Sequence, residues 1–193
     1  MSVTTGSASD SAQSTAKTVG IGAVAGLGAA LLGYLATYVA TSSTIENSTA
    51  SQVLEALGSD ISTWKVVGWV FMNAHGVTTN FPGLFGTTSS TNLIEGVEAF
   101  SAVLYAVPAV ALLAAGVVSA VACGASSAKS GAMAGGSTVL GYLPVALAGL
   151  ALFAITIGDA VARPDPVTSV LLAGIVYPAV LGIVGGVAAS AIR

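Results

Sequence analysis

The chain contains four long stretches in which apolar residues follow one another without a charged side chain. They cover residues 18–40, 99–122, 131–157 and 167–192. A helix rises about 1.5 Å per residue and the hydrocarbon core of a bilayer is about 30 Å thick, so each stretch is long enough to cross it. The pattern predicts an all-α integral membrane protein, with four transmembrane helices in a single domain over residues 18–193.

The segment before the first apolar stretch has a different composition. Residues 1–17 are rich in serine, threonine, alanine and glycine, and we expect a disordered polar tail there. A cleaved signal peptide is the alternative for the apolar stretch that follows, but its apolar core would be only about 7–15 residues long. We therefore expect residues 18–40 to be retained as the first span, with Gly22-x-x-x-Gly26 as a close packing face.

Residues 41–98 form the one long segment between spans, and they hold a short amphipathic pattern. Trp64, Val67, Phe71 and His75 recur at i, i+3, i+7 and i+11, which places them on one face of a helix. A helix from Trp64 to His75 would reach about 18 Å, roughly half a bilayer. We expect it to lie in the interface, to re-enter the membrane or to cap the bundle, without crossing.

Two capping boxes suggest further helix starts in this segment. Thr49 with Gln52 predicts a short helix, and Asn92 with Glu95 predicts a helix that continues into the second span. The other polar segments are expected to be turns and loops: residues 80–91, 123–130 and 158–166.

The distribution of charge predicts an orientation. Charged residues make up only 7% of the chain, and Lys17, Lys129 and Arg193 fall on one side of a four-span arrangement. By the positive-inside rule that side is cytoplasmic. Seven of the eight acidic residues fall on the other side. We expect both termini in the cytoplasm and residues 41–98 outside the cell membrane.

The composition also excludes several kinds of chemistry. A net charge of −3 argues against a nucleic-acid partner. The single cysteine, Cys123, cannot form an intramolecular disulfide, and one histidine without a carboxylate in the apolar stretches does not suggest a metal site. The chain shows no nucleophile–base pair and no phosphate-binding loop, so we expect no cofactor and no enzymatic activity.

Two short sequence motifs occur in the same order in each half of the chain. Leu32-Gly-Tyr-Leu35 recurs as Leu140-Gly-Tyr-Leu143, and Pro108-Ala-Val110 recurs as Pro178-Ala-Val180. This repetition predicts two related helical hairpins, arranged as a parallel repeat. Chance similarity in a sequence rich in glycine and alanine is the alternative.

Three of the four spans contain a proline, which gives the first group of candidate functional residues. Pro108, Pro144 and Pro178 each free a backbone carbonyl, and such carbonyls can coordinate a cation or line a transport path. The alternative is that the kinks only shape the bundle. Tyr142 and Tyr177 lie beside two of the kinks and are expected to hydrogen-bond the freed carbonyls.

The amphipathic segment gives the second group of candidates. His75 and Asn73 stand at its end, where a histidine can titrate, bind a ligand or cap carbonyls. Trp64 and Trp69 are candidates for binding, although an aromatic belt at the membrane interface explains them equally well.

Several of these segments resemble a known family. They are Leu32–Leu35, Asp60–Trp69 with Asn73–His75, Leu140–Pro144 and Leu172–Pro178. Together they resemble an uncharacterised family of multipass membrane proteins from halophilic archaea, some of whose members are loosely labelled transporters. The resemblance implies a haloarchaeal cell membrane and adds no catalytic residue.

The leading hypothesis from the sequence is a non-enzymatic structural or accessory subunit of the cell membrane. Its partners would be the lipid bilayer and either another membrane protein or further copies of the chain. The alternative is a small oligomeric channel or transporter that uses the proline-broken helices.

Overall fold

The computed structural model describes residues 5–48, 62–83, 87–157 and 160–192. Its elements, in chain order, are α1 (Thr5–Glu46), α3 (Thr63–Asn73), β1 (Thr79–Pro82), β2 (Thr88–Thr91), α4 (Leu93–Gly96), η2 (Ala102–Tyr105), α5 (Ala106–Ala122), α6 (Ala128–Gly136), α7 (Val139–Leu152), β3 (Ile155–Ile157), β4 (Ala160–Pro164), α8 (Pro166–Thr168), η3 (Ser169–Val176) and α9 (Tyr177–Ala191).

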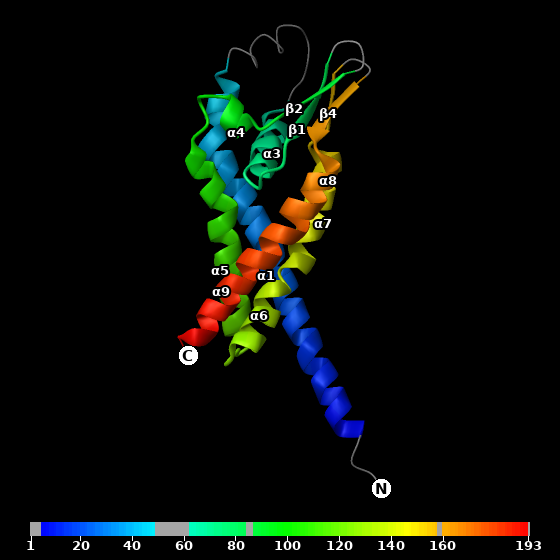
Figure 1. Ribbon diagram of the computed structural model, residues 1–193, viewed down its shortest axis with the longest axis vertical. Coiled ribbons are helices and arrows are strands. Elements are labelled where there is room, and N and C mark those ends of the chain that lie inside the picture. Colours follow the sequence, from blue (N-terminus) through cyan, green and yellow to red (C-terminus); the bar gives the residue numbers. More distant parts are fainter. Residues whose placement is uncertain (1–4, 49–61, 84–86, 158–159, 193) are drawn as a thin grey trace.

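Four helical segments are long and apolar enough to cross a membrane. They are Gln13–Glu46, Ala102–Ala122, Ala128–Leu152 and Pro166–Ala191. The predicted all-α fold with four spans is confirmed. Figure 1 shows the spans spread apart at the end that carries the strands, called the sheet end below, and closer together at the opposite end, where the chain finishes.

The helical segments differ from expectation at three boundaries. α1 begins at Thr5, so most of the segment expected to be a disordered tail is helical. The third span ends at Leu152, because the β-branched residues Ile155–Ile157 form β3 instead of a last helical turn. Asn92 caps α4 as predicted, but α4 ends at Gly96 and Val97 is extended, so this helix does not continue into the second span.

A small sheet at the sheet end was not predicted. Its strand order is β2-β1-β4-β3, and all three pairings are antiparallel. The segments 80–91 and 158–166, expected to be loops, contribute three of these strands. The central pairing sets Thr79 opposite Pro164 and Asn80 opposite Arg163. These partners come from distant parts of the chain, so local sequence patterns give no sign of the pairing.

Glycine allows the spans to approach each other closely. A Cβ atom at Gly22 or Gly26 would collide with Ser137 or Thr138 of the third span. The predicted Gly22-x-x-x-Gly26 face is therefore used inside the bundle. Gly135 and the Gly182 backbone are also in direct contact, as are other glycines of α5, α6 and α9: Gly116, Gly131 and Gly186. Such close backbone approach is a usual way of holding membrane helices together.

Candidate functional site

The helix α3 lies inside the spread sheet end of the bundle. Its residues Val67–Asn73 are all buried, so it has no solvent-facing side over this length. Gly76, with φ of 75°, reverses the chain, which then returns to the sheet end through β1 (Figure 1). The expected short helix therefore forms and enters the bundle. We call the unit of α3 and β1 the plug.

Trp64 and Trp69 behave differently. Trp64 is 39% exposed, as an interfacial aromatic would be, and its backbone carbonyl accepts a hydrogen bond from Tyr34 at 2.9 Å. Trp69 is 4% exposed and donates from Nε1 to the Phe153 carbonyl at 2.6 Å. An interfacial belt therefore does not explain Trp69, which ties α3 to the end of the third span.

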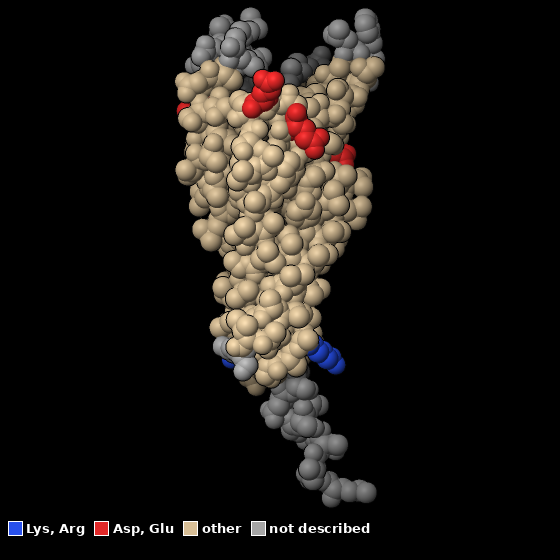
Figure 2. Space-filling model, turned by 60° about the vertical axis from the view of Figure 1, so that its left-hand side comes forward, with Lys and Arg blue, Asp and Glu red and all other residues tan. Residues whose placement is uncertain are grey.

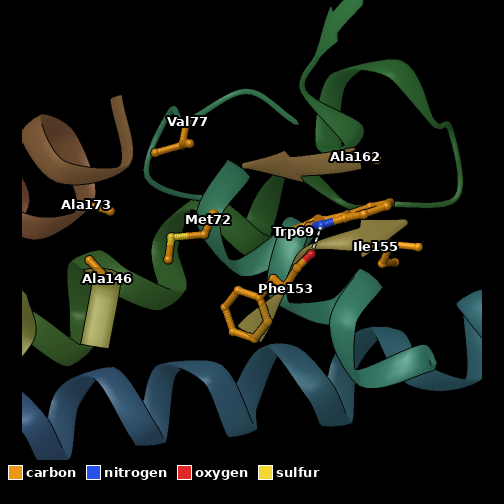
Figure 3. Close-up of a cluster of buried hydrophobic side chains, with 8 residues drawn as sticks. All are labelled: Trp69, Met72, Val77, Ala146, Phe153, Ile155, Ala162 and Ala173. Carbon is orange, nitrogen blue, oxygen red and sulfur yellow. Dashed lines mark hydrogen bonds between the residues drawn. The ribbon is translucent and has the colours of Figure 1, made fainter. Parts of the chain in front are cut away.

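Trp69 belongs to a buried cluster that joins the plug to the third and fourth spans (Figure 3). Its members come from α3, α7, η3, the sheet and the loops beside them: Trp69, Met72, Val77, Ala146, Phe153, Ile155, Ala162 and Ala173. At Gly68 a Cβ atom would collide with the Phe153 ring, so glycine is needed for this fit. The cluster fixes the depth of the plug.

His75 lies just beyond the inner end of α3 and is completely buried. Its Nδ1 is 2.8 Å from the Phe71 carbonyl and its Nε2 is 2.7 Å from the Tyr142 hydroxyl. A carbonyl can only accept, so Nδ1 carries the proton, and the neutral ring accepts from Tyr142 at Nε2. The ring centroid of Tyr177 lies 5.2 Å from that of His75.

The environment of His75 favours the uncharged ring. Burial lowers the pKa of His75 to about 4, and the hydrogen bond to the Phe71 carbonyl opposes this only partly. The aromatic side chains around the ring are Phe71, Tyr142 and Tyr177, and none of its described contacts is with a carboxylate. His75 therefore combines a carbonyl cap with a bridge from the plug to α7.

Asn73 connects the plug to its neighbours. Its Nδ2 donates to the Val77 carbonyl at 2.7 Å and to Thr79 Oγ1 at 3.2 Å, while its Oδ1 accepts from the Leu93 N–H at 2.9 Å. Both the NH₂ group and the oxygen of the side-chain amide are therefore hydrogen-bonded. Asn73 is therefore occupied in holding α3, β1 and α4 together.

A polar network at the sheet end was missed by the sequence reasoning. Asn92 Nδ2 donates to the Tyr105 hydroxyl at 2.9 Å, and Tyr105 donates to Glu95 Oε1 at 3.0 Å. The only sign of this network in the sequence was the capping box predicted at Asn92 and Glu95. Asn92 does cap α4, by accepting from the Ile94 N–H, but Glu95 binds Tyr105 instead of completing the box.

The three prolines stand in different settings. Pro144 lies inside α7. Pro108 follows η2, which is a 3-10 helix, and Pro178 follows η3, which is a π-helix, and both prolines are buried. Tyr142 does not bond a freed carbonyl, since its hydroxyl binds His75. The helix type thus changes near the proline in two of the three spans.

A groove runs along the outside of the bundle between α1 and α5. It has a volume of about 580 Å³ and is lined almost entirely by small and apolar side chains. Those from α1 include Ala25, Gly28, Ala29, Leu32, Gly33 and Ala36. A Cβ atom at Gly28 would meet nothing within 4 Å, so this glycine is not used for packing inside the bundle.

The described residues do not form a recognisable catalytic or metal centre. Within them, no three histidine, cysteine or acidic side chains come together as a metal site would need. Asp165 is used structurally: it accepts from the Thr168 N–H at 2.9 Å, and this bond lowers the pKa of its carboxyl. The expected cap at Thr49 and Gln52 lies outside the described residues, as does Asp159.

Comparison with known proteins gives a family but no activity. No curated protein and no solved structure matches the chain. A family model described as a family of unknown function, DUF7978, matches residues 1–193. Because the match covers the whole chain, this four-span protein belongs to the DUF7978 family.

Proposed function

We propose that the protein is a non-enzymatic accessory subunit of the cell membrane, which binds a transmembrane helix of a partner protein in the groove between α1 and α5. The observation that carries the proposal is Gly28. Most described glycines of the spans lie against a neighbouring helix or side chain, but Gly28 opens into the groove. Small residues at a helix surface allow another helix to approach closely.

The interior of the bundle supports the same proposal. A transporter needs polar groups along a path, whereas Tyr142 and His75 are buried and bonded to each other. Toward the opposite end, the spans contact one another through glycine backbone atoms of α5, α6 and α9. This close packing suits a subunit that presents a surface to another protein. An enzyme would need His75 beside a carboxylate, and its described partners are a carbonyl and a hydroxyl.

The orientation is part of the proposal. Both termini lie in the cytoplasm, and the sheet end faces outward. On the face shown in Figure 2, acidic side chains lie toward the sheet end and basic ones toward the opposite end. This separation agrees with the positive-inside rule.

Labelling of Cys123 tests the orientation. Cys123 follows α5 at the end opposite the sheet and is partly exposed. We expect a membrane-impermeant maleimide to label it in opened membranes but not in intact cells. A Cys123→Ser variant is the control for other reactive groups. Strong labelling of Cys123 in intact cells would reverse the proposed orientation.

Binding in the groove is tested by two glycine variants. Gly28→Leu places a large side chain in the groove, and Gly20→Leu places the same side chain on α1 at a position that does not line it. At both glycines a Cβ atom meets nothing within 4 Å, so both variants should fold. After purification from its own membrane in mild detergent, we expect a stoichiometric partner with the wild type and Gly20→Leu, and at least about tenfold less of it with Gly28→Leu.

Two results would contradict this proposal. Equal amounts of partner with both variants would show that the groove is not the binding surface. A homo-oligomer without a second protein would favour the alternative, a small channel or transporter. The change of helix type beside Pro108 and Pro178 supports that alternative, and ion-flux assays on Tyr142→Phe and Tyr177→Phe would then test it.

We also propose that the chain arose by duplication of a helical hairpin in a haloarchaeal ancestor. Pro108 and Pro178 begin the two copies of the Pro-Ala-Val motif. Both prolines are buried, and both follow a segment that is not α-helical. The plug would then be an addition to the first hairpin.

A further inference from the structure

The third and fourth spans are both irregular at the same depth. Between α6 and α7, Leu140 and Gly141 donate their N–H groups to carbonyls three residues back, as in a tight 3-10 turn. Thr138, in this turn, donates from Oγ1 to the Pro178 carbonyl at 3.1 Å. The break in the third span therefore lies directly against the point where η3 gives way to α9.

The fourth span is wide and incompletely bonded on the sheet side of this point. The Tyr177 N–H donates to the Leu172 carbonyl, five residues back, as in a π-helix. Pro178 has no N–H to continue the helical ladder. The buried hydroxyl of Ser169, at the other end of η3, has no hydrogen-bond partner among the described residues. Ser119 in α5 has the same feature, so the π-helical bonding is what distinguishes η3 from the other spans.

The two halves on either side of the break are joined internally. On the opposite side, α6 and α9 are in glycine-to-glycine contact, Gly131 with Gly186 and Gly135 with Gly182. On the sheet side, β3 and β4 connect α7 to α8, and Asp165 caps α8.

Further hydrogen bonds tie the plug to this sheet-side half. Lys65 Nζ donates to the Ala154 carbonyl at 2.8 Å, and the Asp165 N–H donates to the Thr78 carbonyl at 2.8 Å. By contrast, α1 runs without interruption from Thr5 to Glu46 beside both halves. The first span therefore gives a straight frame, while the third and fourth spans can bend.

We propose that the third and fourth spans share a hinge at Thr138 and η3, about which their sheet-side halves move together relative to α1 and α5. Conversion of one π turn to an α turn would take up the motion, since the hydrogen bond of a π turn encloses one residue more than that of an α turn. Tyr177 stands at the hinge with its ring beside His75, so a movement at the hinge changes the packing around His75.

Spin-label distances in lipid bilayers test the hinge. In a Cys123→Ser background, one pair of labels is placed at the sheet end, at Val103 and Leu152, and a second pair at the opposite end, at Val118 and Met133. All four side chains are exposed. We expect the distance distribution of the sheet-end pair to be at least about twofold broader than that of the other pair. Equally narrow distributions for the two pairs would overturn the proposal.

A deletion tests the role of η3 directly. Leu171 is exposed and lies in η3, so its removal should turn the π segment into an α-helix and narrow the distribution of the sheet-end pair to that of the other pair. Deletion of Val184, exposed in the α-helical α9, is the control, because it puts Gly185 and Gly186 out of register and should greatly reduce folded protein. A folded Leu171 deletion with an unchanged broad distribution would exclude η3 as the hinge. If the Leu171 deletion does not fold, the test of the hinge is the comparison of the two label pairs in the protein without a deletion.

Discussion

Gly182→Ala is expected to lower the free energy of unfolding by about 3 kcal/mol, at the upper end of what overpacking usually costs. The added Cβ atom would collide with the Gly135 carbonyl and would lie 2.5 Å from Thr138 Oγ1. The first of these is a backbone atom, so it cannot rotate away as the end of a long side chain would. To relieve the contact, α6 and α9 must separate, which weakens the neighbouring contact of Gly131 with Gly186. Unfolding by SDS in mixed micelles, followed by tryptophan fluorescence, measures the change.

The matched control is the same substitution at Gly20. A Cβ atom there meets nothing within 4 Å. Gly20→Ala should therefore leave stability unchanged or raise it by up to about 1 kcal/mol, because alanine favours the helix more than glycine does. The two variants differ only in what the new methyl group meets. Equal effects at Gly182 and Gly20 would show that close glycine contact does not hold the spans together.

Acidification from pH 6.5 to 4 is expected to destabilise the protein by about 3 kcal/mol through His75 alone. Burial lowers the pKa of His75 to about 4 in the folded protein, whereas an unfolded histidine titrates near 6.5. Between these values the unfolded chain binds more protons, so folding stability must rise with pH and fall as the pH is lowered. Stability measured in SDS at several pH values gives the slope.

Two variants separate protonation from packing. His75→Phe removes the titrating group, and its stability should be independent of pH between 6.5 and about 5. Tyr142→Phe keeps the histidine but removes the donor to Nε2, so we expect it to lose about 1–3 kcal/mol and to retain the slope. Asp165 contributes in a lower range, because a carboxyl with a lowered pKa in the folded protein loses stability only as the pH falls below about 5. A wild-type slope that persists in His75→Phe would contradict the assignment to His75.

The sequence predicted the four spans well because a membrane imposes a simple rule. Each span needs about 20 residues without charge, and that requirement is visible along the chain. The strands were missed for the opposite reason. β1 pairs with β4, more than 80 positions away in sequence, and Asn80 and Asp165 reinforce the pairing by a hydrogen bond at 3.2 Å. Nothing in either short polar segment indicates its partner.

The sequence identified several of the polar and aromatic residues that contact one another, but it did not predict which residue contacts which. His75 and Tyr142 were both selected, but for different reasons, and their mutual hydrogen bond could not be foreseen because it joins the plug to the third span. The helical pattern also gave no reason to expect a buried Trp69, since this residue lies off the predicted apolar face. Because the spread spans surround α3, its remaining sides are buried as well. A one-sided pattern predicts a surface helix and fails for one enclosed by other helices.

The length of α1 has a consequence beyond the bundle. Its 42 residues correspond to about 63 Å of helix, roughly twice the thickness of the hydrocarbon core. Figure 1 shows its first turns continuing past the ends of α6 and α9. The part of α1 from Thr5 to Lys17 is about 18 Å long. A soluble protein fused to the N-terminus would thus stand clear of the bilayer on a stiff stalk, at a height set by the number of helical turns.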